Sequence, residues 1–344
     1  SGLDFDLKFA VLQIECRKKI LKKLPEISNL ERFIFSSSLS AEQCTCQTVA
    51  EFHSTLFKGM NTVLDMTSGV GIDDFYIAKN VKKLIAIEKN PNTAFAHKYN
   101  MAANNRDNVI TINDDCINYM NHIINSNQKF DAIYIDPARR DKLDKRVFGF
   151  ECCEPNILDL LDKISIATPC LYIKASPMID ITQALKEIEG ITDIWIIGVK
   201  NECKELLFKV NFTHKCNMQK IHTINFENDT CTQSVSFNWP VSEHVISYSD
   251  AIMDYLYEPN CCLMKAGVFN ELQCQYQSIH KLGKNTHIKS LHNKYPKINV
   301  SVRNFKLEAQ ELKKRLKVND GGNLFLFGVT VGYKDMMLAI AEKI

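Results

Sequence analysis

The chain has 344 residues, of which 45% are hydrophobic and 24% are charged. This balance excludes a disordered or collagen-like chain, and the length is enough for two or three domains. The apolar runs are far shorter than the roughly 20 residues of a membrane span, and no secretory signal is visible. We therefore expect a cytoplasmic protein without a membrane partner.

The N-terminal part predicts helices. Residues 3–23 have the spacing of an amphipathic helix, which Pro25 ends. Lysines lie on one face, and the apolar face holds Leu7, Val11 and Ile14, with Ile20 and Leu21 as further candidates. A second helical stretch follows Ser40, which we expect to cap it. These features define an N-terminal helical segment, residues 1–55.

From residue 60, short apolar runs alternate with helix-length segments. The predicted strands are Thr62–Met66, Lys83–Glu88, Val109–Asn113, Phe130–Asp136, Pro169–Lys174 and Ile194–Val199. A seventh strand, Glu205–Phe212, would close the edge of the sheet. Residues 201–205 before it favour a hairpin with solvated charges, and the alternative is that they overhang the site. This alternation is typical of α/β proteins and predicts a Rossmann-like, mostly parallel seven-stranded sheet in a domain of residues 56–212.

The pattern changes again after residue 212. We expect a β-hairpin from Ile221–Phe226 and Gln233–Asn238, then a helix at Ser249–Leu256. The last elements are predicted as strand, helix, strand and helix, at Val300–Arg303, Glu308–Leu316, Asn323–Thr330 and Lys334–Glu342. Gly321 and Gly322 would form the turn before the last strand. Two small α+β modules, residues 213–270 and 271–344, are the prediction.

The glycine-containing stretch Val63–Asp73 is the strongest chemical signal. It places Gly69 and Gly71 in a tight loop after the first strand, where open α/β sheets bind ligands. A dinucleotide site would carry a third glycine, which is missing here. Asp73 and Asp74 at the start of the helix would repel a pyrophosphate and suit a ligand with an ammonium group, such as S-adenosylmethionine. Alone, the loop is also compatible with an ordinary βα turn.

The ends of the next three strands carry further polar residues. Glu88 follows the second strand and is placed to bind both hydroxyls of a ribose. Asp114 and Asp115 follow the third strand, where a carboxylate can accept from an adenine amino group. The fourth strand ends in Asp136-Pro137-Ala138-Arg139. Because the carboxyl ends of parallel strands share one edge, we expect these groups to form a single site.

At these motifs the sequence resembles class I methyltransferases, and its C-terminal third resembles a group of bacterial RNA methyltransferases with a ferredoxin-like insert and a THUMP-like module. The resemblance implies S-adenosylmethionine as cofactor. The cofactor-binding residues we predict are Asp65, Thr67, Gly69, Gly71, Asp73, Glu88, Lys89, Asp114, Asp115 and Cys116. Asp136, Pro137 and Arg139 are the predicted catalytic residues.

The Asp136 loop departs from the D/N-P-P-aromatic pattern of amino-group methyltransferases. In that pattern the first residue and a proline carbonyl accept from the target amine, and the aromatic ring stacks on a flipped base. Ala138 and Arg139 stand in place of the second proline and the aromatic residue. Arg139 then either holds a phosphate or stacks on a base, or it pairs with a local carboxylate.

The thirteen cysteines show no C-x-x-C pair, so we expect no metal and reduced thiols. Cys152 and Cys153 follow the Asp136 loop, and a thiolate there could attack a pyrimidine as in carbon-5 methyltransferases. Nothing in their sequence context marks either as activated. We favour buried or incidental thiols.

Residues 280–317 hold eleven basic and only two acidic residues, while the whole chain has a net charge of +2. Such a region neutralises phosphates, and Tyr295 and Phe305 could stack on bases. A solvated charged face is the alternative. The leading hypothesis is therefore a methyltransferase that acts on RNA. The alternatives are methylation of DNA, protein or a small molecule, a catalytically silent module that binds cofactor and RNA, and a nicotinamide dehydrogenase.

Overall fold

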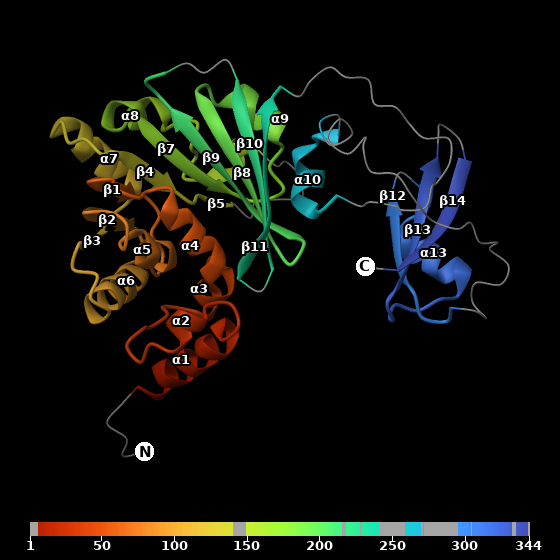
Figure 1. Ribbon diagram of the computed structural model, residues 1–344. Helices are drawn as coiled ribbons and strands as arrows, with labels where there is room; N and C mark the ends of the chain where they lie inside the picture. The colour runs from red at the N-terminus through yellow and green to blue at the C-terminus, as the bar shows by residue number, and fades with distance from the viewer. Residues whose placement is uncertain are drawn as a thin grey trace. The chain divides into compact units, whose positions relative to one another are not determined.

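The protein is described here from a computed structural model. It describes residues 6–139, 149–214, 218–227, 229–240, 259–269, 271, 295–303, 305–331 and 335–342. The chain divides into two units, which Figure 1 shows as a large α/β unit and a smaller one. The first unit comprises residues 1–240 and 261–266, and the second comprises residues 241–260 and 267–344.

A nine-stranded sheet forms the centre of the first unit. Its strands are β1 (Thr62–Asp65), β2 (Lys83–Glu88), β3 (Val109–Asn113), β4 (Ala132–Ile135), β7 (Cys170–Ala175), β8 (Ile191–Val199), β9 (Glu202–Asn211), β10 (Gln219–Glu227) and β11 (Thr230–Trp239). They lie in the order β11-β10-β8-β9-β7-β4-β1-β2-β3. The five strands from β3 to β7 are all parallel, and β9 runs antiparallel to both of its neighbours.

The prediction of seven strands was therefore wrong in number. The expected hairpin of residues 221–238 forms as β10 and β11, but β10 pairs with β8 and so extends the main sheet. The seventh predicted strand, β9, lies inside the sheet rather than at its edge. Its run Leu206–Phe208 is fully buried, as expected of a strand that is covered on both faces and paired on both sides.

Helices cover both faces of this sheet (Figure 1). α4 (Gln47–Thr55) and α5 (Ile72–Ile77) lie on one face, and α7 (Cys116–Asn125) and α8 (Leu161–Ala167) lie on the other. Further helices of this unit are α6 (Pro91–Ala103), α9 (Ile181–Glu187) and α10 (Cys261–Ala266). Phe57, just after α4, packs its ring against Tyr134 and Tyr172 of the sheet. This packing holds the N-terminal segment on the sheet.

Three short helices precede α4: α1 (Leu7–Ile20), α2 (Pro25–Ser28) and α3 (Ser38–Gln43). Their core contains Cys16, Ile20 and Phe33, which cluster with Phe75 of α5. Ser37, rather than the predicted Ser40, caps α3, and Ser40 completes the capping box from the third helical position.

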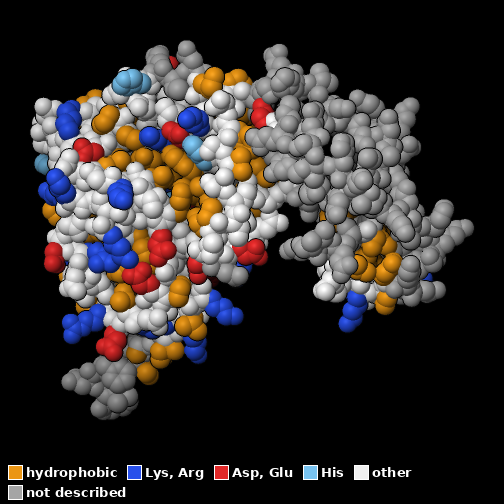
Figure 2. Space-filling model, in the orientation of Figure 1, with side chains coloured by type: hydrophobic (Ala, Val, Ile, Leu, Met, Phe, Trp, Pro, Cys, Tyr) orange, Lys and Arg blue, Asp and Glu red, His pale blue; other side chains and the backbone are white. Residues whose placement is uncertain are grey.

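Most of the predicted apolar face of α1 is exposed, and of its candidate residues only Ile20 is fully buried. Leu7, Val11 and Ile14 are all more than 40% exposed, while Cys16 and Ile20 are fully buried. Figure 2 shows apolar side chains at the lower end of the first unit, where α1 lies. Sequence spacing predicted the helix but not which of its sides would find a partner.

In the described residues of the second unit, the helix α13 packs against a three-stranded sheet in the order β12-β13-β14. Its elements are β12 (Asn299–Arg303), α13 (Ala309–Leu316), β13 (Leu324–Val331) and β14 (Asp335–Glu342). Ile298, Leu312 and Leu326 are at the centre of its core. The last element was predicted as a helix, but it pairs antiparallel with β13, because strand pairing overrides local propensity.

Several predicted features of the C-terminal third lie outside the described residues. These are the helix at 249–256 and residues 280–294 of the basic region. Tyr295 and Phe305, which could stack on bases, are partly buried and pack against the core of the second unit, and their role in stacking remains a prediction. The domain boundaries at 212 and 270 remain predictions.

Candidate functional site

The carboxyl ends of the parallel strands bring the predicted site residues to one edge of the sheet. In the register of the strands, Asp65 lies opposite Ala86 of β2 and Tyr134 of β4, and Glu88 lies opposite Asn113. Ile135 lies opposite Ile173, so that Asp136 and Lys174 follow side by side. The expected convergence of polar groups at this edge is present.

Hydrogen bonds join the glycine loop, at Ser68 and Gly69, to the end of β2. The Ser68 amide and hydroxyl both donate to the carbonyl of Ile87, at 2.9 and 3.1 Å. The Gly69 amide donates to Oε2 of Glu88 at 3.0 Å, and Oε1 of Glu88 accepts from the Asn90 amide at 2.7 Å. Glu88 is therefore held at the loop by both of its carboxylate oxygens.

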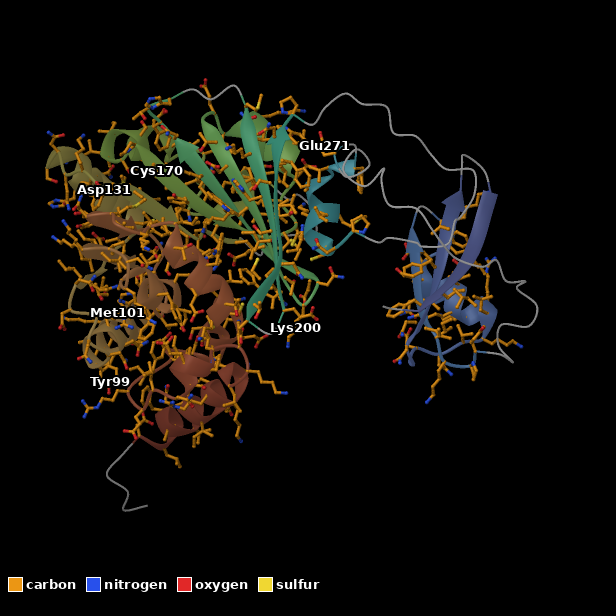
Figure 3. The ribbon with its side chains drawn as sticks, in the orientation of Figure 1. Tyr99, Met101, Asp131, Cys170, Lys200 and Glu271 are labelled. Atoms are coloured by element: carbon orange, nitrogen blue, oxygen red, sulfur yellow. The ribbon has the colours of Figure 1, made fainter. Side chains whose placement is uncertain are left out.

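The two glycines of the loop meet opposite surroundings. Both have a positive φ, 56° for Gly69 and 89° for Gly71. A Cβ at Gly71 would lie 2.5 Å from the methyl carbon of Met101 and 2.7 Å from the ring of His97, whereas a Cβ at Gly69 would meet nothing within 4 Å. Met101 is labelled on α6 in Figure 3. The loop is thus packed tightly beneath Gly71 and open at Gly69, where a ligand can approach the backbone.

Residues at the end of β3 close one side of this opening. The side-chain amide of Asn113 donates to the main-chain carbonyls of Glu88 and Lys89. Asp115 caps α7 and forms an ion pair of 2.9 Å with Lys89. Asp114 accepts from the Asp115 amide, and burial raises the pKa of the Cys116 thiol to about 11. These residues lie beside Glu88 as expected, and their assignment to the cofactor remains a prediction.

Beneath the loop, Asp65 and Asp74 form a buried acidic pair. Burial raises the pKa of Asp65 well above its usual range, and the charge of Asp74 adds to this rise. Burial also raises the pKa of Asp74 to about 8. Nε2 of His97 lies 2.8 Å from the Asp74 carboxylate. Asp65 fixes the loop by accepting from the Thr67 amide at 2.7 Å, while only 2% of the residue is exposed.

The Asp136 loop begins directly beside the glycine loop. The Asp136 amide donates to Oγ1 of Thr67 at 2.7 Å, and Pro137 is buried. The backbone of Ala138 and Arg139 forms the short strand β5, which pairs with β6 (Cys153–Glu154). Cys153 is consequently buried in this ladder. The side chain of Arg139 lies outside the described residues, so its two interpretations stay predictions.

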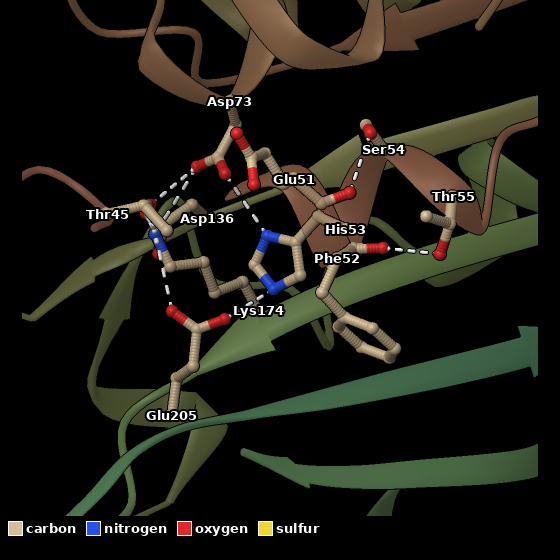
Figure 4. A network of polar contacts seen from close by, with 10 residues as sticks. All are labelled: Thr45, Glu51, Phe52, His53, Ser54, Thr55, Asp73, Asp136, Lys174 and Glu205. Carbon is tan, nitrogen blue, oxygen red and sulfur yellow. Dashed lines mark hydrogen bonds and ion pairs between the residues drawn. The ribbon is translucent and has the colours of Figure 1, made fainter. Parts of the chain in front are cut away.

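A buried network of charged side chains lies on the other side of Asp136 (Figure 4). Nζ of Lys174 donates to Oδ2 of Asp136 and to Oγ1 of Thr45, both at 2.8 Å. It also lies 3.5 Å from Asp73 and 3.9 Å from Glu205. Burial alone would lower the pKa of Lys174, but these three carboxylates raise it well above its ordinary value.

His53 of α4 completes the network between two of the carboxylates. Its Nδ1 lies 3.1 Å from Asp73, and its Nε2 forms an ion pair of 2.5 Å with Glu205. Burial would lower the pKa of His53, but Glu205 and Asp73 raise it to about 9. Burial would raise the pKa of Asp73, but Lys174 and His53 hold it below its usual range. Asp73 therefore points into this network, and its predicted role as a cofactor ligand remains untested.

Sequence reasoning missed most of this network. Lys174 carried a signal, because it ends a predicted strand as Asp136 does. Glu205 was interpreted as part of a solvated hairpin, whereas only 8% of its side chain is exposed. Thr45 and His53 precede the first strand, and nothing in their spacing marked them.

The described residues contain neither a membrane-spanning helix nor a cluster of metal ligands. Within those ranges, no helix has both the length and the apolar character needed to cross a membrane. Nor do three or more His, Cys, Asp or Glu side chains there form a group that could hold a metal ion.

The chain is similar to known domain families at its C-terminal end and to a solved structure along its whole length. A ferredoxin-like domain model matches residues 255–290, and a THUMP domain-like model matches residues 277–343. A crystal structure from Porphyromonas gingivalis W83, described as a candidate methyltransferase, is 26% identical, with a TM-score of 0.86 over 100% of this chain and 92% of that chain. The comparison with curated protein sequences returned no match.

Two other solved structures are similar over about half of the chain. The tRNA m1G37 methyltransferase of M. jannaschii is 17% identical, covering 50% of this chain and 52% of its own, with a TM-score of 0.34. The O-methyltransferase of Bacillus cereus is 12% identical, covering 49% and 83%, with a TM-score of 0.39.

The fold of the first unit is that of class I, S-adenosylmethionine-dependent methyltransferases. Within that class, the chain has the architecture of the Porphyromonas gingivalis protein along its whole length. It combines the methyltransferase fold with ferredoxin-like and THUMP-like regions at the C-terminal end.

Proposed function

We propose that this protein transfers a methyl group from S-adenosylmethionine to RNA. The observation that carries the proposal is the open glycine loop bonded to Glu88, beside a partly exposed Asp136. A backbone that a ligand can approach, next to a carboxylate at the end of β2, suits a nucleoside with two ribose hydroxyls. When bound, the cofactor supplies an electrophilic methyl group on a sulfonium.

The residues at the strand ends fit this cofactor. Glu88 is the acceptor for the ribose hydroxyls, because its carboxylate is already oriented by the Gly69 and Asn90 amides. The neighbouring residues Asp114 and Asp115 provide acceptors for the adenine amino group. Gly69 leaves the backbone accessible. These are the residues with which the chain would hold the cofactor.

Asp136 is the residue we assign to the acceptor group. Its side chain is 41% exposed, although its neighbours in the network are nearly buried. A carboxylate in this position accepts a hydrogen bond from the acceptor and aligns its lone pair with the methyl group. Such catalysis works mainly by positioning and by electrostatics.

The assignment to RNA rests on the C-terminal end of the chain. Its THUMP-like match spans residues 277–343. Five basic side chains in the described part of that segment are exposed: Lys297, Lys306, Lys314, Arg315 and Lys317. Such side chains neutralise phosphates, so binding to RNA would weaken as salt is raised.

The test is methyl transfer from radiolabelled S-adenosylmethionine to total RNA taken from cells that lack the protein. We expect incorporation into RNA that exceeds incorporation into DNA or protein, with filter binding that weakens between 50 and 200 mM salt by on the order of 10-fold or more. Labelling of DNA, protein or small molecules instead would favour those alternatives. Cofactor binding without any transfer would favour a silent cofactor- and RNA-binding protein.

A further inference from the structure

We propose that Lys174 and His53 are positioning residues that together direct Asp136 toward the methyl acceptor. This inference rests on the proposed function for the role of Asp136. It adds that the N-terminal helices, through Thr45 and His53, form part of the acceptor site.

The hydrogen bonds of Lys174 exclude direct contact between its ammonium group and a substrate. An ammonium group has three N–H donors. One donates to Asp136 and one to Thr45, both at 2.8 Å, and the third faces Asp73 and Glu205 at 3.5 and 3.9 Å. No donor is left for a substrate, so Lys174 acts through Asp136.

The two ring nitrogens of His53 each face a carboxylate. A neutral imidazole can donate from only one nitrogen, whereas an imidazolium donates from both. His53 is fully buried between Asp73 on α5 and Glu205 on β9, and its ring also lies against Tyr134 on β4. The charged form places a positive ring between the two carboxylates, with a hydrogen bond to Asp73 and an ion pair with Glu205.

The charges of the network explain why two cations are needed. Asp73, Asp136 and Glu205 compete for Lys174. His53 neutralises the two inner carboxylates, whose side chains are only 12% and 8% exposed. Lys174 is then free to make its short contact with Asp136, the most exposed of the three. Without the charge on His53, Lys174 would be drawn toward Asp73 and Glu205 and away from Asp136.

Three carboxylates and two cations leave one net negative charge, and it lies at the exposed end of the network. Burial raises the pKa of Asp136, and Lys174 opposes that rise. Removing Lys174 would therefore favour the protonated form of Asp136, which can no longer accept a hydrogen bond at both oxygens. Side chains from α4, α5, β7 and β9 thus control the protonation state of one carboxylate.

The first readout does not need activity. Carboxyl ¹³C resonances of aspartate would be titrated in the full chain and in Lys174→Met, Thr45→Val and His53→Gln, with Asp136→Asn used for assignment. We expect the pKa of Asp136 to rise by about 1–3 pH units in Lys174→Met. A smaller rise is expected in His53→Gln. Thr45→Val removes two hydrogen bonds, one from Lys174 and one to Asp73, but no charge, so it remains informative if Lys174→Met does not fold. It is expected to give the smallest rise.

The second readout is methyl transfer to total RNA from cells lacking the protein. Lys174→Met should lower kcat on the order of 100-fold with little change in KM for S-adenosylmethionine, because the acceptor is misplaced while the cofactor site is intact. The wild type should lose activity as pH rises through about 9, where His53 deprotonates, and His53→Gln should lack this decline. The matched control is His122→Gln, an exposed histidine on α7, which should behave as the wild type.

The two readouts separate failure of this inference from failure of the proposed function. An unchanged titration of Asp136 in all three variants would overturn the inference, whatever the activity. A wild type that transfers no methyl group, together with a shifted Asp136 titration in Lys174→Met, would overturn the proposed function and support the coupling of these residues.

Discussion

The edge of the sheet at the carboxyl ends of the parallel strands has two halves, which hold their carboxylates in different ways. On the side of β2, the glycine loop presents open backbone at Gly69 and a carboxylate held by main-chain amides. On the side of β7, Asp136 is held by the side chains of a closed network. The open half is suited to binding a ligand, and the closed half is suited to fixing the orientation and charge of one group.

This difference indicates where substitutions should affect stability and where they should affect binding. Charges in the closed half are compensated only by one another. Groups in the open half are exposed to water, which can replace a lost partner. Each of the following variants tests that distinction.

The largest effect is expected in the closed half. Lys174→Met leaves Asp73, Asp136 and Glu205 without their common partner. We expect a loss of about 3–5 kcal/mol in the free energy of unfolding, measured by urea denaturation at pH 7. Lys209→Met on neighbouring β9 is the control: its ammonium group lies 3.8 Å from Asp193 and is one-third exposed. That variant should lose about 1 kcal/mol or less. Equal losses would contradict the account of the network.

The glycine loop offers a matched pair of substitutions. Gly71→Ala would place a methyl group 2.5 Å from Met101 at a positive φ, so we expect a loss of about 2–4 kcal/mol from strain and overpacking. Gly69→Ala has the backbone strain but open space, and should lose about 1 kcal/mol. Urea denaturation of both variants gives the comparison. A Gly69→Ala variant as unstable as Gly71→Ala would show that the loop is not open there.

The pH dependence of stability tests the charge on His53. Its folded pKa of about 9 exceeds the ordinary value of 6.5, so its stabilising contribution is complete below pH 6.5 and is lost as pH rises through 9. Between these values, wild-type stability should fall by about 3 kcal/mol more than that of His53→Gln. Asp74 also lowers stability over part of this range, but it is common to both proteins. Parallel curves for the two proteins would argue against a charged His53.

The smallest effects are expected at the end of β3. Asp115→Ala removes the cap of α7 and should cost about 1 kcal/mol. Lys89→Met breaks only an ion pair whose lysine is 71% exposed, and it should leave the midpoint of thermal unfolding unchanged. Thermal unfolding of both variants distinguishes the cap from the ion pair. A larger effect of Lys89→Met would mean that the ion pair, rather than the cap, holds this side of the site.

The open half was predictable from the sequence, and the closed half was not. Glu88 ends a short apolar run, and Gly69 lies in the loop after another, so strand prediction alone brought them to one edge. Of the closed half, Asp136 carried the same signal, because it also follows a strand directly. His53 lies within a helix, and its partners Asp73 and Glu205 are 20 and more than 150 residues away. Only the tertiary arrangement of α4, α5 and β9 brings them together. The exposed face of α1 differed from expectation because spacing does not tell which side of a helix is covered. The strand β14 differed although its partner β13 is close in the sequence, because pairing with β13 rather than local spacing decides its conformation.

The central claim is that the open half of the edge binds S-adenosylmethionine through Glu88, and isothermal titration calorimetry of the full chain tests it most directly. We expect one-to-one binding by the wild type, weakened on the order of 10- to 100-fold in Glu88→Gln, since a hydrogen bond to a charged group contributes about 1.5–3 kcal/mol. Glu227→Gln, at an exposed position at the end of β10, should bind as the wild type does. Absence of binding by the wild type, or equal affinity in Glu88→Gln, would contradict the account.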